Sequence, residues 1–230
     1  MNKNRFDIKS FGENGWIATI HDDADLVADA LFVNTVAKTL RTKPGIIDAV
    51  AGIDSVTMRY APSALSNDAA QITLVEAIEN TPTDFSEPTT TIEIPICYGT
   101  EYGPDTEEIA NTLGLEKGEL IKLHAASAYR VLAVGFAPGF AYLGPTDETL
   151  HCNRRDTPRP QVAAGSVGIA GNMTGIYPLP SPGGWHIIGR TPIPLFDPLA
   201  EEPFIFHPGA EVRFREITED EFGALSEASR

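Results

Sequence analysis

The sequence predicts a small α+β domain followed by a mainly-β barrel domain. In the first ~88 residues, short β-prone runs alternate with two segments of helical periodicity in the order ββαββα. Residues 81–91 then carry two prolines and no apolar periodicity, which is typical of a domain boundary. From Ser127 onward, short β-prone runs separated by Gly and Pro turns favour a closed or nearly closed barrel over a doubly wound sheet. We therefore expect domains at residues 1–88 and 89–230.

Turn and capping residues predict the elements of the first domain. The expected strands are residues 6–9, 16–20, 46–50 and 55–60. Asp22 and Asp23 are the candidate caps of a helix that closes before Pro44. Ser66 or Asn67 is the candidate cap of a second helix. This order predicts a sheet with helices on one face.

The second domain begins with a strand and two helices. The strand around Pro95 is expected at the edge of a sheet, because proline has no N–H to donate to a neighbour. Asp105 or Thr106 is expected to cap a helix that Gly114 ends, and residues 117–124 are expected to form another. The barrel strands follow.

The chain is acidic and has the composition of a globular protein. Its 230 residues carry a formal net charge of −15, and 42% of them are hydrophobic. Nucleic acids and anionic membranes attract clustered cations, so neither is expected as the main partner. Cys97 and Cys152 stand apart from any ligand cluster, so we expect no disulfide and no structural metal. No apolar run approaches the roughly 18 residues of a membrane span, and the predicted location is the cytoplasm.

The negative charge is unevenly distributed. Residues 1–134 and 191–230 have net charges of −10 and −6, whereas residues 135–190 have a net charge of +1 with arginine as their only cation. Residues 135–189 also hold 10 of the 20 glycines and 7 of the 18 prolines. Because large apolar residues are interleaved with them, we expect a packed surface rich in loops rather than a linker.

Two motifs in this segment are candidates for a binding surface. The run Gly135-Phe-Ala-Pro-Gly-Phe-Ala-Tyr-Leu-Gly144 can present Phe136, Phe140 and Tyr142 as a pocket wall, or it can close one end of the barrel. The run Arg154-Arg-Asp-Thr-Pro-Arg159 clusters three cations whose planar forks suit carboxylate or phosphate. The alternative is that these arginines pair with the protein's own acids.

A glycine-rich run, residues 165–175, is a third candidate. Its backbone N–H groups can form an anion-binding nest, with hydroxyls from Ser166, Thr174, Tyr177 and Ser181 nearby. A nucleophilic role for Ser166 is not favoured, because no GxSxG elbow surrounds it and no histidine is identified as its base. His124 and His186 are interpreted as hydrogen-bonded structural residues rather than general bases.

Seven motifs in chain order resemble one bacterial family. They are Gly99-Thr-Glu-Tyr-Gly-Pro-Asp105, Gly135-Phe-Ala-Pro-Gly-Phe-Ala-Tyr-Leu-Gly144, Arg155-Asp-Thr-Pro-Arg159, Ala164-Gly-Ser-Val-Gly-Ile-Ala-Gly171, Thr174-Gly-Ile-Tyr-Pro178, Ser181-Pro-Gly-Gly-Trp185, and Ile188-Gly-Arg-Thr-Pro192 with Leu195-Phe-Asp197. They are similar to the 5-oxoprolinase B subunit, whose family is also called allophanate hydrolase subunit 1 or the sporulation-kinase inhibitor family. The resemblance is strong over residues ~95–215 and loose in the first domain. Ala163 and Thr100 depart from the family pattern of proline and glycine, which bears on local loop shape.

The resemblance implies a fold, an activity and partners. The barrel would be cyclophilin-like, and the protein would belong to the carboxyltransferase-domain group. The chain would act with a larger homologous C subunit and a separate A subunit, and would be inactive alone. The complex would use ATP, with Mg²⁺, to open the small molecule 5-oxoproline to glutamate. A complete ATP site is not visible in this chain.

The resemblance also implies site residues. Arg155 and Arg159 would bind anionic groups and are the candidates for catalytic residues, although no catalytic residue is identified. The residues that would bind the substrate are His124, Phe136, Gly139, Tyr142, Ser166, Thr174, Tyr177, Ser181, Gly183, Gly184, Trp185 and Arg190. Of these, the four aromatic residues could instead contact another subunit. Two other functions stay open, an inhibitor of histidine-kinase autophosphorylation and a component of allophanate or urea metabolism.

Overall fold

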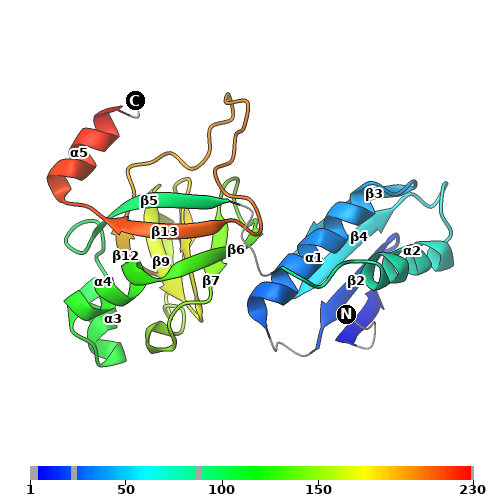
Figure 1. The fold of residues 1–230 in the computed structure, drawn as a ribbon, viewed down its shortest axis with the longest axis horizontal. Helices are drawn as coiled ribbons and strands as arrows, with labels where there is room; N and C mark the ends of the chain where they lie inside the picture. Colours follow the sequence, from blue (N-terminus) through cyan, green and yellow to red (C-terminus); the bar gives the residue numbers. More distant parts are fainter. Residues whose placement is uncertain (1–4, 22–24, 86–89, 229–230) are drawn as a thin grey trace. The chain divides into compact units, whose positions relative to one another are not determined.

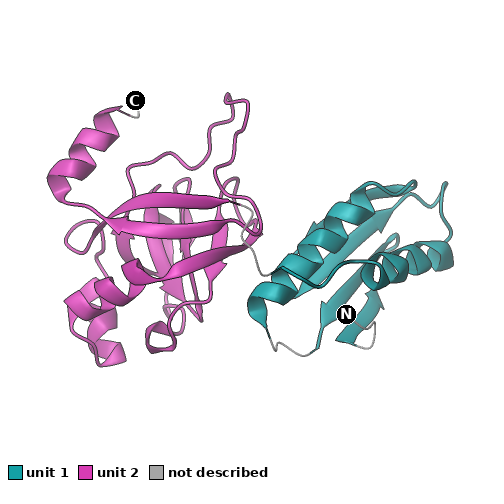
Figure 2. Ribbon diagram, in the orientation of Figure 1, with its two compact units in different colours: residues 1–87 teal, residues 88–230 magenta. Residues whose placement is uncertain are grey.

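The protein consists of two compact units. The computed structural model describes residues 5–21, 25–85 and 90–228. Residues 1–87 form the smaller unit and residues 88–230 the larger one (Figure 2). Each unit has its own hydrophobic core. The predicted boundary, between residues 88 and 89, lies outside the described residues.

A four-stranded antiparallel sheet and two helices make up the smaller unit (Figure 1). The strands are β1 (Phe6–Ser10), β2 (Gly15–Ile20), β3 (Ile46–Ala51) and β4 (Ser55–Tyr60). Their order in the sheet is β1-β2-β4-β3. Helix α1 (Leu26–Arg41) packs on β3 and β4, and helix α2 (Asn67–Glu79) contacts α1 and β2. Apolar side chains from all six elements meet in one core.

Capping side chains set where both helices begin. Asp25 caps α1, because its carboxylate accepts hydrogen bonds from two N–H groups of the first turn. The predicted caps Asp22 and Asp23 lie outside the described residues. Ser66, rather than Asn67, caps α2. In both cases a side-chain oxygen serves N–H groups that have no partner within the helix.

The larger unit is built on a closed seven-stranded barrel, which confirms the predicted barrel domain. Its strands are β5 (Thr91–Tyr98), β6 (Ala128–Val134), β7 (Ala141–Gly144), β9 (Ser166–Ala170), β10 (Met173–Ile176), β12 (His186–Arg190) and β13 (Glu211–Glu216). Their order around the barrel is β10-β7-β6-β13-β5-β12-β9. The pair β13 and β5 is parallel, whereas the other described pairs are antiparallel. Parallel pairing therefore joins the first and last strands of this unit.

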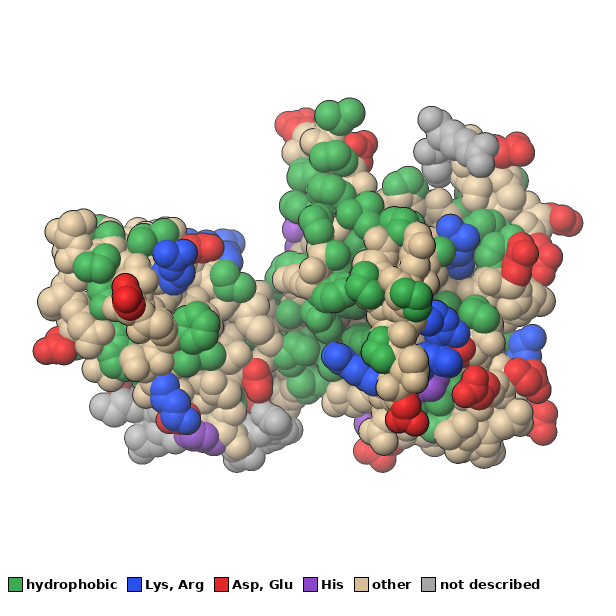
Figure 3. Space-filling model, turned by 180° about the vertical axis from the view of Figure 1, so that it is seen from behind, with side chains coloured by type: hydrophobic (Ala, Val, Ile, Leu, Met, Phe, Trp, Pro, Cys, Tyr) green, Lys and Arg blue, Asp and Glu red, His purple; other side chains and the backbone are tan. Residues whose placement is uncertain are grey.

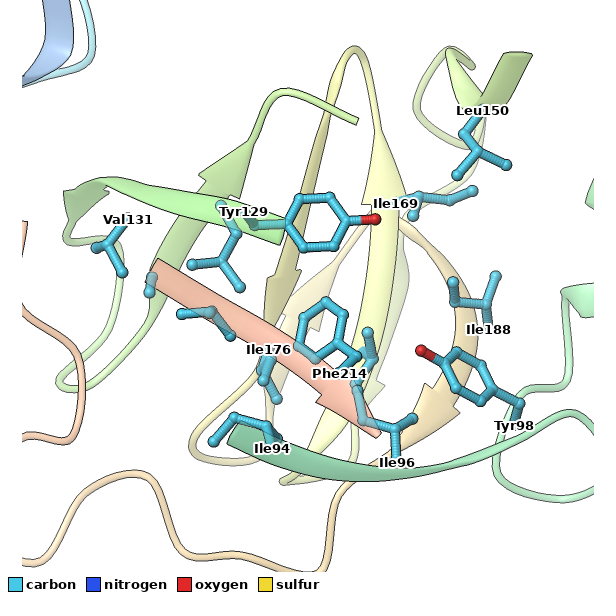
Figure 4. Packing of buried hydrophobic residues seen from close by; sticks show 14 of the residues in the cluster. Ile94, Ile96, Tyr98, Tyr129, Val131, Leu150, Ile169, Ile176, Ile188 and Phe214 are labelled. Carbon is cyan, nitrogen blue, oxygen red and sulfur yellow. The ribbon is translucent and has the colours of Figure 1, made fainter. Parts of the chain in front are cut away.

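Branched aliphatic and aromatic side chains fill the barrel (Figure 4). Ile94, Ile96, Ile169 and Ile176 come from three strands and are at most 2% exposed. Phe214 of β13 lies among them in Figure 4. The interior is thus a packed core, as in other small barrels. A ligand has to bind on the outside of the barrel or at its ends.

The predicted edge position of the strand around Pro95 is wrong. β5 has a neighbour on each side, β13 and β12. Pro95 lies beside Arg215 of β13, but β12 pairs only with Cys97 and Tyr98 at the end of β5. At Pro95, β5 therefore has no paired residue on the side that faces β12. A residue without an N–H is tolerated there because no ladder partner stands on that side.

Several elements lie outside the barrel. Helix α3 (Thr106–Leu113) packs against β12, and helix α4 (Lys117–Ala126) packs against α3 and β13. Gly114 ends α3 in a left-handed conformation, as predicted. Strands β8 (Arg159–Val162) and β11 (Ser181–Gly183) pair with each other in a separate two-stranded arm. Helix α5 (Glu219–Ala228) follows β13 (Figure 1).

Candidate functional site

A buried carboxylate lies between two arginines at the start of α3. Asp105 is 2% exposed. Nη1 and Nη2 of Arg159 donate to its two oxygens at 2.9 and 2.6 Å. Nη1 of Arg155 donates to Oδ1 at 3.0 Å, and the backbone N–H of Ile187 donates to Oδ2 at 2.7 Å. We call Asp105, Arg155 and Arg159 the Asp105 triad. Its two guanidinium groups and one carboxylate together have a net charge of +1.

Close backbone contacts bring the triad together. The N–H of Arg155 donates to the carbonyl of Gly184 at 2.8 Å, which ties the arginine segment to the start of β12. A Cβ on Gly103 would lie 2.1 Å from the carbonyl oxygen of Ile188. Only glycine allows the turn before α3 to approach β12 this closely. The approach places Asp105 beside the arginines.

A groove of about 540 Å³ borders the triad. Helix α3 lines one side, and residues 151–157 with His186 line the other. Its ionisable side chains are Glu108, His151, Cys152, Arg154, Arg155, Asp156 and His186. Figure 3 shows basic side chains gathered beside acidic ones on the larger unit. The volume of the groove lies in the range of small-molecule sites.

Five aromatic side chains form a second group: Phe136, Phe140, Tyr142, Tyr177 and Trp185. Phe140 lies at the centre, with edge-on ring contacts to Tyr177 at 5.3 Å and to Trp185 at 5.8 Å. Phe136 covers it and is 64% exposed. Tyr177 and Trp185 are buried, so within this cluster Phe136 and the half-buried Tyr142 are the rings best placed to meet a ligand or a partner.

The β8–β11 arm connects the aromatic cluster to the triad. Arg159 of β8 lies opposite Gly183 of β11. A Cβ on Gly183 would lie 2.4 Å from the hydroxyl oxygen of Tyr177. Burial raises the pKa of Tyr177, and the nearby charges of Arg154 and Arg159 oppose that shift. The tyrosine hydroxyl therefore stays protonated at neutral pH.

The predicted glycine-rich nest is not formed. Residues 166–176 make the β9–β10 hairpin, which has β12 on one side and β7 on the other. Its N–H groups are therefore used in the barrel ladders. Ser166 and Thr174 are buried in these strands. Ser181 lies in the arm, and Nε of Arg190 donates to the carbonyl of Ala164 at 2.8 Å. None of these four side chains lines the groove.

His124 lies in the barrel core rather than at the surface. It is 0% exposed, and its ring stacks on Phe214. The hydroxyl of Thr174 donates to the carbonyl of Gly168 at 3.0 Å. Nε2 of His124 must then donate to Thr174 Oγ1 at 2.9 Å, and the Tyr98 hydroxyl donates to Nδ1 at 2.8 Å. Burial lowers the pKa of His124 to about 3, so the ring is neutral.

Exposed apolar side chains gather on neighbouring loops. Among the described residues of the larger unit, the exposed large hydrophobic side chains are Val134, Phe136, Leu179, Leu199 and Phe204. A shallow groove of about 450 Å³ runs between residues 134–139 and 204–208. Gly139, with a φ of +83°, lets this loop contact Phe196, which stacks on Phe204. Hydrophobic side chains follow the projecting part of this unit in Figure 3. We call this area the apolar loop surface.

The described residues show neither a metal cluster nor a membrane helix. No three His, Cys, Asp or Glu side chains among them are grouped so that they could hold a metal ion. No described helix combines the length and apolar character needed to cross a membrane. Cys97 and Cys152 are free thiols, and burial raises the pKa of Cys152 to about 11. This thiol is therefore protonated at neutral pH.

The role of Asp105 is not predictable from the sequence. An acidic residue before a helix is typical of a cap. Asp105 occupies the cap position of α3, but its side chain makes no capping hydrogen bond because it faces the arginines. The alternative that Arg155 and Arg159 pair with the protein's own acids is thus confirmed. Arg154, one of the three clustered arginines singled out in the sequence, lines the groove, and so does His186, which is interpreted from the sequence as a structural residue.

Residues 6–206 match the carboxyltransferase domain, subdomain C and D. The 5-oxoprolinase B subunit of Bacillus subtilis (strain 168) is 33% identical over 237 residues, which cover 98% of each chain. The protein of the same name from Escherichia coli O157:H7 is 41% identical over 183 residues, which cover 78% of this chain and 82% of that one.

Solved structures share the fold. TTHA0988 is 35% identical with a TM-score of 0.77, over 89% of this chain but only 40% of its own. The conserved uncharacterized protein PH0987 from Pyrococcus horikoshii is 36% identical with a TM-score of 0.57, over 94% of this chain and 99% of its own. The sequence matches extend over nearly the whole chain. The chain therefore belongs to the family of the 5-oxoprolinase B subunit, within the carboxyltransferase domain group of subdomains C and D.

Proposed function

We propose that this chain is one subunit of an ATP-dependent 5-oxoprolinase complex that opens 5-oxo-L-proline to L-glutamate. The observation that carries the proposal is the Asp105 triad beside a groove of small-molecule size, in a chain related from end to end to proteins named for this subunit. The protein has a net charge of −15, which would repel an anionic substrate. The surplus positive charge of the triad lowers that repulsion locally.

The proposed reaction explains why ATP is needed. An unactivated lactam is a poor electrophile, because its nitrogen is a poor leaving group. Transfer of the γ-phosphoryl group of ATP to the lactam oxygen gives ADP and a carbon that water attacks readily. Addition of water, cleavage of the ring C–N bond and release of phosphate then give glutamate. Cations and hydrogen-bond donors placed where negative charge develops accelerate such steps.

This chain would supply only part of the reaction site. The described residues group no three metal-ligating side chains, so we assign no Mg²⁺ site to this polypeptide. We place ATP with its Mg²⁺ in the complex as a whole. The partners would be a larger homologous C subunit and a separate A subunit, in the cytoplasm, and the chain would be inactive alone. TTHA0988, whose chain is more than twice as long as the part matched here, supports the need for further polypeptide.

Co-expression with the two partner polypeptides tests the proposal. The full set is expected to release glutamate from 5-oxoproline only when ATP is supplied, whereas each chain alone is expected to be inactive. Arg155→Ala should abolish turnover while the subunits still co-purify. The matched control is Arg213→Ala, because Arg213 lies on β13 in an exposed ion pair with Glu211. A fully assembled but inactive complex with the unmodified chain would overturn the proposal.

The apolar loop surface favours a second candidate function, a binding protein that inhibits autophosphorylation of a histidine kinase. Large exposed apolar patches are typical of protein interaction sites. Purified kinase incubated with labelled ATP should lose autophosphorylation when the chain is added, and Phe136→Ser should restore it. Unchanged labelling would exclude this candidate. No feature of the described residues favours a role in allophanate or urea metabolism over these two functions.

A further inference from the structure

We propose that Arg154 and Arg155 form a binding subsite for an oxyanion, a carboxylate or phosphoryl group, and that Asp105 and Arg159 are positioning residues that do not touch the ligand. This inference rests on the proposed function and divides the arginine cluster into two roles. The division follows from how each guanidinium is engaged by the protein itself.

Arg159 has both of its terminal nitrogens committed to the protein. Nη1 and Nη2 donate to separate oxygens of Asp105 at 2.9 and 2.6 Å, the two-bond geometry in which arginine binds a carboxylate most strongly. The same carboxylate also accepts from Ile187, and it is 2% exposed. A ligand that took Arg159 would leave a buried carboxylate poorly paired, which is costly. Arg159 therefore belongs to the scaffold.

Arg155 is only partly engaged. Its Nη1 donates to Asp105 at 3.0 Å and lies 3.7 Å from Glu108, whose side chain is 68% exposed. Among the described residues, Nη2 of Arg155 makes no hydrogen bond or ion pair, and the side chain is 25% exposed toward the groove. One end of the guanidinium is thus fixed while the other can meet a ligand. A fixed donor binds at a lower entropic cost than a mobile one.

Arg154 is exposed, but its backbone is held on both sides. Cys152 exchanges two backbone hydrogen bonds with Gly171, at 3.2 and 2.6 Å. Nε2 of His186 donates to the carbonyl of Asn153 at 3.0 Å. On the other side, the N–H of Arg155 donates to the carbonyl of Gly184. No ion pair to Arg154 occurs among the described residues, so its charge is available in the groove.

Two cations on a braced segment, one of them fixed by the buried carboxylate of Asp105, match the chemistry of an oxyanion. The groove also holds Glu108 and Asp156, both exposed, and these limit binding to small anions that reach the guanidinium forks directly. The two sources of such a group are the carboxylate of 5-oxoproline and a phosphate. They share the same hydrogen-bond geometry and differ in charge.

Titration of the isolated chain tests the subsite without any assay of turnover. The probes are inorganic phosphate and 5-oxoproline, each at constant ionic strength, followed by calorimetry and by the NMR signal of the Arg155 Nε–H group, whose nitrogen is buried. At least one probe should bind with a dissociation constant of about 1 mM and shift that signal. The probe that binds identifies the source of the oxyanion.

Substitutions separate the two roles. Arg154→Gln and Arg155→Gln should each weaken binding about tenfold, as expected for the loss of one charge-assisted contact. Arg159→Lys keeps the charge and should change affinity by less than about threefold while lowering the melting temperature. Arg213→Gln, in an exposed pair on β13, should change neither.

Three results would overturn the subsite: no binding of either probe, unchanged affinity in Arg154→Gln, or a loss in Arg159→Lys as large as that in Arg154→Gln. Binding by the isolated chain combined with an inactive complex would instead overturn the proposed function and leave the subsite standing. An active complex together with an isolated chain that binds neither probe would overturn the subsite and leave the proposed function standing.

Discussion

Asp105 and Arg159 form a two-bond ion pair of 2.9 and 2.6 Å across 54 residues of sequence. The carboxylate side chain is 3% exposed and that of the arginine 27%. The pair joins the N-terminus of α3 to the β8–β11 arm. It is therefore a tertiary contact that holds the groove in shape.

Removal of the Asp105 carboxylate should destabilise the larger unit strongly. Asp105→Ala leaves two guanidinium groups without their buried partner, and the expected loss is about 3 kcal/mol of unfolding free energy. Urea unfolding in a Trp16→Phe background measures it, because Trp185 then reports on the larger unit alone.

The matched control is Glu93→Ala, which removes an exposed ion pair with Arg215 in the same unit. Such a pair contributes at most about 1 kcal/mol. Equal losses in the two variants would contradict the structural role given to the triad.

Acid should weaken the larger unit through His124. Its pKa is about 3 in the folded protein, against 6.5 for an unperturbed histidine. Above pH 6.5 the ring is neutral in both states, so this group adds no pH dependence. Between pH 6.5 and 3, His124 is protonated in the unfolded chain but not in the folded one. The free energy of unfolding therefore decreases by about 1.4 kcal/mol for each unit by which the pH is lowered.

His124→Gln should remove that part of the slope, although it also lowers stability at neutral pH by disturbing the hydrogen bonds to Tyr98 and Thr174. NMR titration of the imidazole measures the pKa directly. A ring that titrates near pH 6.5 in the folded protein would contradict the buried, neutral assignment.

Gly103 should not tolerate a side chain. In Gly103→Ala the new Cβ would lie 2.1 Å from a backbone carbonyl oxygen of β12, which cannot move aside cheaply. We expect a loss of several kcal/mol, because backbone would have to shift at the triad. Gly118→Ala in α4 is the control, since no atom lies within 4 Å of the Cβ that the substitution adds. That variant should gain up to about 1 kcal/mol from helix propensity. Thermal unfolding of both variants measures the contrast, and similar melting temperatures would contradict it.

At position 136, glycine should destabilise the protein less than alanine does. Its φ is +71°, in the left-handed region, which costs a non-glycine residue roughly 1–2 kcal/mol. Phe136→Gly relieves this cost and Phe136→Ala does not, while both lose the same ring contacts with Phe140 and Tyr177. The glycine variant should be more stable than the alanine variant by about 1 kcal/mol. The opposite order in chemical denaturation would show that the loop relaxes without the ring.

Most elements of the fold are predictable because local chemistry determines them. A hydroxyl at Ser66 caps α2, and a glycine at position 114 ends α3. These signals act over a few residues and need no knowledge of the rest of the chain. The barrel itself follows from many short strands between Gly and Pro turns, which leave little room for crossover helices.

The chemistry of the site depends on contacts that local patterns do not encode. The carboxylate of Asp105 accepts hydrogen bonds from residues 50, 54 and 82 positions away. His124 lies near the predicted motifs in sequence, but the barrel places it in the core, where Tyr98 and Thr174 reach its two nitrogens. The aromatic cluster is better predicted, because alternating aromatic and turn residues already indicate a rigid loop.

Parallel pairing of β13 with β5 has a consequence for synthesis on the ribosome. The smaller unit makes its contacts within the first 87 residues and can fold while the rest of the chain is still being translated. The barrel cannot close before residues 211–216 have left the exit tunnel, because they fill the place between β5 and β6. Until then β5 and β6 have open edges, so the nascent larger unit is the part of this protein that chaperones would protect.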